Sequence, residues 1–407
     1  MRSAQFAQAL ARLDRTAAIA VLLTPAMLMH AHAFAEATMG VTSVCFLARS
    51  AIARDWGWVR FTWVRIGFAW VIVCSLPIPA LGLGPGGGRS LVQAIAMGRF
   101  LIFAAALENE ALNATWARRW LQGIIVLCAA YIAVHSLFQA ATGYNIYGEP
   151  RGGDGELTGP FGKPRAGPPA ARIVFPAIVP LVAKLLNRPG LASTVGAYAL
   201  LLTLLGLAVT ALLLPQLRRV VIVACAAGAL LVAATVVVSP PTYHRLVMKF
   251  SDQMDHFPTS QYGQLFARAL EIGHQHPVFG RGSDGFRSGC ALPRYFRPTL
   301  DGRQPDGGGA AICAQHPHNF SMEAFTNGGI PGLMLYSALS LAWLFAVGRG
   351  LWRRPEPLGV GLFASVFIQI WPIASTSGFT SMPMGGWFFL LLGWGLAEGR
   401  RRMLATP

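Results

Sequence analysis

Long apolar runs alternating with short basic segments set the pattern of this chain. Apolar stretches lie at about 17 to 34, 37 to 49, 66 to 82, 91 to 107, 121 to 141 and 169 to 186, and again at about 220 to 239, 331 to 348, 357 to 375 and 383 to 398. A helix needs roughly 20 residues to cross a bilayer. The pattern therefore predicts an all-α integral membrane protein with about twelve transmembrane helices, in one polytopic domain over residues 1–407.

Residues 190–217 leave the number of helices open. This stretch is apolar throughout and ends at Arg218-Arg219. Its 28 residues suit one full span better than two, since each crossing needs roughly 20. Two short tilted helices, however, would keep Arg218-Arg219 inside and place the polar segment after residue 239 outside.

Composition and charge support the membrane assignment. Hydrophobic residues make up 54% of the 407 residues and charged residues only 12%, and the mean hydropathy is +0.49. The net charge of +16 comes from short clusters between apolar runs, which is typical of cytoplasmic loops rather than of a nucleic-acid-binding stripe. We expect both termini in the cytoplasm and two periplasmic loops, a first one at 142–168 and a large one at 240–330.

The large loop ends in a polar segment that leads straight into an apolar span. It reads His316-Pro317-His318-Asn319-Phe320-Ser321-Met322-Glu323 and continues to Gly332. A helix from His318 to about Asn327 would place His318, Ser321 and Met322 on one face. Asn327-Gly328-Gly329 would end that helix.

Two glycine-rich blocks precede this segment. One is His276-Pro277-Val278-Phe279-Gly280-Arg281-Gly282, followed by Phe286-Arg287, and the other is Thr158-Gly159-Pro160-Phe161-Gly162-Lys163-Pro164-Arg165. In their order and spacing the three blocks resemble the O-antigen ligase and polymerase superfamily of bacterial membrane glycosyltransferases. The resemblance implies a GT-C-like fold in the inner membrane with its active site on the periplasmic side. It also implies a metal-independent, inverting enzyme without a cofactor, which transfers a glycan from undecaprenyl diphosphate to a lipid A-core sugar hydroxyl.

The resemblance assigns roles to individual residues. His318 would be the catalytic base, because the unperturbed pKa of histidine suits proton acceptance near neutral pH. Arg165 and Arg287, with Arg281 and Lys163, would bind the diphosphate, since a guanidinium fork matches phosphate oxygens. Asn319, Gly159 and Gly329 would support the site.

Cysteine usage adds a covalent constraint. Cys290 and Cys313 flank a Pro- and Gly-rich part of the large loop, whereas the other four cysteines lie in apolar runs. In an oxidising compartment two loop cysteines predict a disulfide, and related ligases resemble this chain in carrying such a pair. The alternative is two free thiols in a cytoplasmic loop.

A zinc site is a further possibility, because His274, His276, His316 and His318 lie in the same loop. Their spacing matches no compact zinc motif, and a disulfide would remove the two thiolates. We expect no metal.

Two other functions remain open. An O-antigen polymerase would use the same donor with a lipid-linked glycan as acceptor. A polytopic transporter would use loop histidines and arginines as a gate, but its spans would be expected to carry Asp, Glu or Lys. The expected partners are the lipid-linked glycan, the lipid A-core acceptor and membrane lipid, with no nucleic acid, and the sequence does not indicate an oligomeric state.

Overall fold

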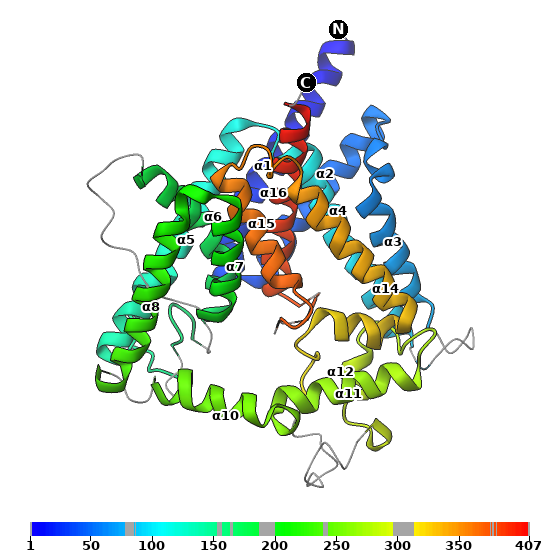
Figure 1. Cartoon of the computed structure of the whole chain (residues 1–407). Helices are drawn as coiled ribbons and strands as arrows, with labels where there is room; N and C mark the ends of the chain where they lie inside the picture. Colours follow the sequence, from blue (N-terminus) through cyan, green and yellow to red (C-terminus); the bar gives the residue numbers. More distant parts are fainter. Residues whose placement is uncertain are drawn as a thin grey trace.

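A computed structural model gives the fold (Figure 1). It describes residues 2–77, 85, 87–152, 157–162, 166–186, 200–238, 243–295, 313–374, 376, 378–379 and 381–405. Within these ranges the regular elements are helices, and one isolated antiparallel bridge joins Tyr144 to Pro150. The all-α fold is therefore confirmed for the part of the chain that is described.

Helices account for each of the apolar runs that fall in the described ranges. The long ones are α1 (Arg2–His30), α2 (His32–Ala53), α3 (Thr62–Ser75), α4 (Gly88–Ala106), α5 (Thr115–Thr142), α6 (Gly167–Leu186), α7 (Leu200–Leu213), α8 (Arg218–Val238), α14 (Phe320–Gly348), α15 (Pro357–Ile370) and α16 (Met384–Leu404). The loop before α14 carries α10 (Phe250–Asp255), α11 (Gln261–Gln275) and α12 (Gly285–Gly289). A π-helical turn, η3 (Leu107–Ala111), follows α4.

Helix α16 lies in the middle of the bundle. Its residues from Trp387 to Leu392, together with Trp394 and Leu396, are at most 1% exposed. A helix that is apolar and buried all round must be covered on every side. Helices α4, α14 and α15 pack against it, and Phe100 of α4 stacks on Phe389 at a ring-centroid distance of 4.8 Å.

The ends of α14 and α16 are joined by arginine contacts. At one end Arg402, near the end of α16, donates through Nε to the carbonyl of Arg349, just after α14 (2.8 Å). Arg401 pairs with Glu356, which precedes α15, at 2.7 Å. The segment before α14 and the helices α11 and α12 lie at the opposite end (Figure 1). Arginines at the ends of α14 and α16 thus lie together at one end of the bundle.

Four helical segments among the described residues are long and apolar enough to cross a membrane: Ser90–Ala111, Thr115–Thr142, Pro215–Ala234 and Phe320–Gly348. Thr62–Ser75 and Pro357–Ile370 are shorter apolar helices. Our larger number of about twelve spans stays a prediction. Of the ambiguous 190–217 stretch, residues 200–213 form α7 and the remainder before it lies outside the described ranges.

One local prediction is wrong. Helix α14 begins at Phe320, and His318 precedes it with a left-handed φ of 54°. His318 therefore does not share a helical face with Ser321 and Met322. The expected stop at Asn327 to Gly329 is a break inside α14, where Gly329 has φ 63° and ψ −154°.

Candidate functional site

Asn319 fixes the start of α14 to the loop that follows α15. Its side-chain oxygen accepts the N–H of Met322 (3.0 Å), which is the usual N-cap bond. Its Nδ2 donates to the carbonyls of Pro372 (2.7 Å) and Ala374 (3.1 Å), and the side chain is 2% exposed. One amide side chain thus joins the start of α14 to the loop after α15, and the supporting role of Asn319 stays a prediction.

His318 lies where three segments meet. Its carbonyl accepts the N–H of Thr376 (2.7 Å). Its ring meets Tyr262 of α11 edge to face at 5.5 Å between centroids, and the ring of His316 lies 4.6 Å away. The side chain is partly exposed. His318, just before α14, is thus held against α11 with its imidazole partly exposed.

Glu323 belongs to this site, although our sequence analysis assigned it no role. One helical turn beyond Asn319, its Oε2 accepts the N–H of Phe379 (3.0 Å). The neighbouring Gly378 packs on His316, since a Cβ there would lie 3.2 Å from that ring. The sequence signal for Glu323 was an acidic residue in the first turn of a predicted helix, a position that favours negative charge.

The Gly280-Arg281-Gly282 block docks on the break in α14. Pro331 has no N–H to offer the carbonyl of Asn327, four residues earlier, and Gly282 donates to that carbonyl instead (2.9 Å). The backbone N–H of Ile330 donates to the carbonyl of Pro277 (2.7 Å). The backbone N–H of Arg281 donates to the carbonyl of Thr326 (2.7 Å). Two motifs that are almost 50 residues apart in sequence therefore form one unit.

Arg281 and Arg287 differ sharply in exposure. Arg281 is buried, and its Nη1 donates to the hydroxyl of Tyr295 (2.8 Å). That hydroxyl lies 2.9 Å from Nε2 of His276. Burial, and then the charges of Arg281 and Arg294, lower the pKa of His276, so its neutral ring can accept from Tyr295. Arg287, on α12, is exposed.

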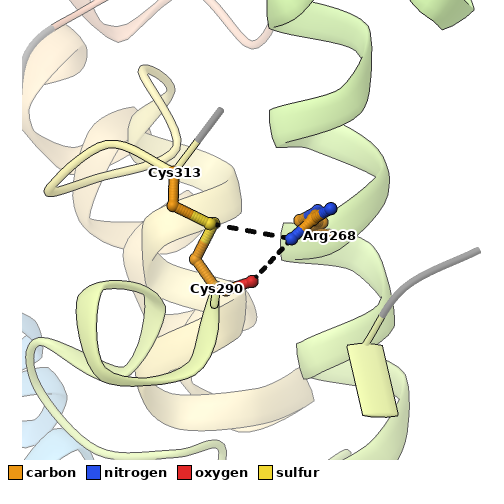
Figure 2. The surroundings of a disulfide bond; sticks show 3 residues. All are labelled: Arg268, Cys290 and Cys313. Carbon is orange, nitrogen blue, oxygen red and sulfur yellow. Dashed lines mark hydrogen bonds between the residues drawn. A yellow bond between two sulfur atoms is a disulfide. The ribbon is translucent and has the colours of Figure 1, made fainter. Parts of the chain in front are cut away.

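Arg268 is the second residue that the sequence did not single out. It is 1% exposed, and its Nη1 donates to the carbonyl of Cys290 (2.7 Å) and lies 3.7 Å from Sγ of Cys313 (Figure 2). Arg268 shares one face of α11 with the buried Leu265, Ala269 and Ile272. The sequence signal for its burial was an arginine among apolar residues that recur every three or four positions along a helix.

The predicted disulfide between Cys290 and Cys313 is confirmed. It joins α12 to the segment that leads to His318, with Cα atoms 5.8 Å apart. The remaining cysteines Cys45, Cys74, Cys128 and Cys225 are free.

Replacing Cys290 and Cys313 with serine should destabilise the large loop by about 3 kcal/mol, because the bond closes a loop of some twenty residues. Hydrogen exchange of α11 and α12 should rise accordingly. Free thiols in protein from an oxidising compartment would contradict the assignment. Cys225→Ser, which removes a free thiol, is the control.

The first glycine-rich block packs on α5. Both the Thr158 and Gly159 N–H groups donate to Oε1 of Gln139 (2.8 and 3.1 Å), and Asn145 donates to the carbonyl of Gly159 (2.8 Å). Gly159 has φ 58°, and a Cβ on it would lie 2.7 Å from that of Ala166. Lys163 and Arg165 lie outside the described residues.

In the part of the chain that is described, the fold is helical, four segments are long and apolar enough to cross a membrane, and the loop before α14 brings histidine and arginine side chains together. Residues 190–337 match the family model described as O-antigen ligase. The match includes the 276–287 block and the 316–332 segment, two of the three blocks that carry the resemblance, and it supports that resemblance. A comparison with curated proteins gives no match.

Proposed function

We propose that this protein is an O-antigen ligase of the bacterial inner membrane, which transfers a glycan from undecaprenyl diphosphate to a sugar hydroxyl of lipid A-core. The observation that carries the proposal is the placement of His318 at the start of a membrane-crossing helix, inside the matched region. A donor and an acceptor that are both anchored in lipid would reach such a site from the bilayer.

In the proposed reaction, the acceptor oxygen attacks the anomeric carbon while His318 takes the hydroxyl proton. The bond between the anomeric carbon and the diphosphate oxygen breaks, and the lipid diphosphate leaves with the electron pair. One displacement inverts the anomeric configuration. Such a base contributes typically 10²–10⁴-fold in rate, and the reaction as written needs neither a metal nor a cofactor.

Charge on the leaving diphosphate would be met by Arg287 and Arg165, with Lys163 nearby in sequence. Arg287 is exposed on α12. Gly285, at the start of α12, donates to Oδ1 of Asn327 (3.2 Å). Asn327 lies on α14 seven residues beyond Phe320, its first residue, roughly 10 Å along the helix axis. The buried Arg281, bonded to Tyr295, would instead hold the loop that presents Arg287.

The Arg287→Lys protein should retain its fold but transfer at least about tenfold more slowly, because an ammonium cannot reproduce two parallel hydrogen bonds to phosphate oxygens. Initial rates with purified lipid-linked glycan would measure the loss. Arg294→Lys is the control, since Arg294 is also exposed in this loop and stacks on the ring of Tyr295. Equal rates for wild type and Arg287→Lys would remove Arg287 from diphosphate binding.

Deleting the gene in its host tests the function directly. Loss of glycan on lipid A-core, with carrier-linked polymer retained, identifies a ligase. Lipopolysaccharide with a single repeat unit identifies a polymerase, and unchanged lipopolysaccharide would contradict both.

The proposed orientation places residues 240–317 in the periplasm and both termini in the cytoplasm. A Thr299→Cys protein should therefore react with a membrane-impermeant thiol reagent in cells whose inner membrane is intact. Protection until that membrane is permeabilised would reverse the orientation.

A further inference from the structure

A polar cavity lies near the ends of α2 and α16, lined by residues of both helices and of the turn after α2. Its volume is about 310 Å³, near the lower limit for ligand sites. It lies beneath the turn between α2 and α3, and the π-helical turn η3 and the end of α16 complete its wall. Single π-helical turns within helices occur frequently at functional sites.

Four charged residues line this cavity, and two of them, Arg400 and Asp55, have partners other than each other. Arg400 donates to Oδ1 of Asn109, and its guanidinium lies 5.4 Å from the centre of the Phe61 ring. Asp55 is exposed and accepts the N–H of Gly57 (3.0 Å). Arg400 therefore keeps donors for an anion, and Asp55 keeps acceptors for a cation.

Arg49, which also lines the cavity, is paired with two carboxylates. Asp14 lies 2.9 Å from its Nε, and Glu110 accepts from its Nη1 at 2.8 Å. The contrast makes Arg400 the cation in this wall that is still suited to an anionic ligand.

Aromatic and unpartnered polar groups complete the wall. The rings of Phe46 and Trp58 lie 5.0 Å apart at 51°, and such faces attract an ammonium group. Trp58 and Glu110 are each 7% exposed. The indole N–H of Trp58 and Oε2 of Glu110 have no hydrogen-bond partner among the described residues. Buried polar atoms normally have one.

We infer that this cavity binds the head group of a zwitterionic phospholipid, with the phosphate on Arg400 and the ammonium between Asp55 and the Phe46 and Trp58 rings. Arginine and tryptophan side chains gather at the depth of lipid head groups, and Trp56 and Val59, exposed beside the cavity, offer apolar surface to the acyl chains. This site is independent of the transfer reaction proposed above.

Native mass spectrometry of the purified full-length chain tests the inference. After delipidation, the protein is offered dioleoyl-phosphatidylethanolamine or dioleoyl-phosphatidylglycerol at equal concentration. One phosphatidylethanolamine should be retained in preference to phosphatidylglycerol, at least about fivefold. Asp55→Asn and Arg400→Gln should each lower this retention about fivefold or more, while Arg353→Gln, an exposed arginine just after α14, should leave it unchanged.

If the Arg400→Gln protein does not fold, the Asp55→Asn protein provides the test. Asp55 is exposed, so its replacement leaves the core untouched. Unchanged retention in the Asp55→Asn protein would overturn the inference, as would equal retention of the two lipids. Soluble glycerophosphoethanolamine is the third probe. If it binds as tightly as the lipid, the ligand is a free phosphate ester and the assignment to lipid is wrong.

Discussion

The His318→Ala protein should fold and insert normally, yet transfer glycan at least about 100-fold more slowly than wild type. A sugar hydroxyl is a poor nucleophile at neutral pH, and the proposed base is the group that removes its proton. The His318 ring is partly exposed, and the fixed contact with Thr376 is made by its backbone carbonyl. Truncating the side chain therefore leaves that tie in place.

The measurement is an in vitro transfer assay with carrier-linked glycan, normalised to folded enzyme. His256→Ala is the matched control, because His256 is an exposed histidine in the same loop, and its rate should stay within about twofold of wild type. Near-normal turnover by the His318→Ala protein would exclude His318 from the chemistry. A loss that only follows the amount of folded protein would give it a structural role.

Hydropathy was sufficient to locate the long helices, because each is set by a local run of apolar residues. The runs at 220 to 239 and 169 to 186 agree with α8 and α6 to within about two residues. The position of the break in α14 was predicted, but the continuation of the helix beyond it was not. Asn327-Gly328-Gly329 indicated an end, but the apolar span beyond Pro331 continues the helix after a kink.

The local sequence pattern could not predict the contacts of the site. His318 takes a left-handed backbone because Thr376, in a loop more than 50 residues later, binds its carbonyl. Arg268 is buried because the disulfide brings the Cys290 carbonyl over α11 (Figure 2). Arg281, which we predicted to bind the diphosphate, is buried and donates to Tyr295, 14 residues later. Each outcome depends on a partner that is distant in sequence.

Replacing Gly329 with alanine should destabilise the protein by more than about 3 kcal/mol, through backbone strain of about 1–3 kcal/mol and the loss of docking hydrogen bonds worth about 1 kcal/mol each. The φ and ψ of Gly329 lie in a region that is essentially restricted to glycine. A Cβ there would lie 2.4 Å from the Pro277 carbonyl oxygen and 3.0 Å from the Gly280 nitrogen. The 277–282 block would have to move away from α14, and its backbone bonds to Thr326, Asn327 and Ile330 would break.

Two measurements check the predicted loss of stability. They are the thermal unfolding midpoint of the detergent-solubilised Gly329→Ala protein and hydrogen exchange of the 277–282 block. Gly40→Ala is the control, since Gly40 is helical and exposed and a Cβ on it would have no neighbour within 4 Å. That change should be neutral or stabilise by up to about 1 kcal/mol. Because this docking also carries α12 with Arg287, transfer by the Gly329→Ala protein should fall even where it remains folded. Wild-type stability and protection of the block in the Gly329→Ala protein would show that the two motifs do not depend on each other.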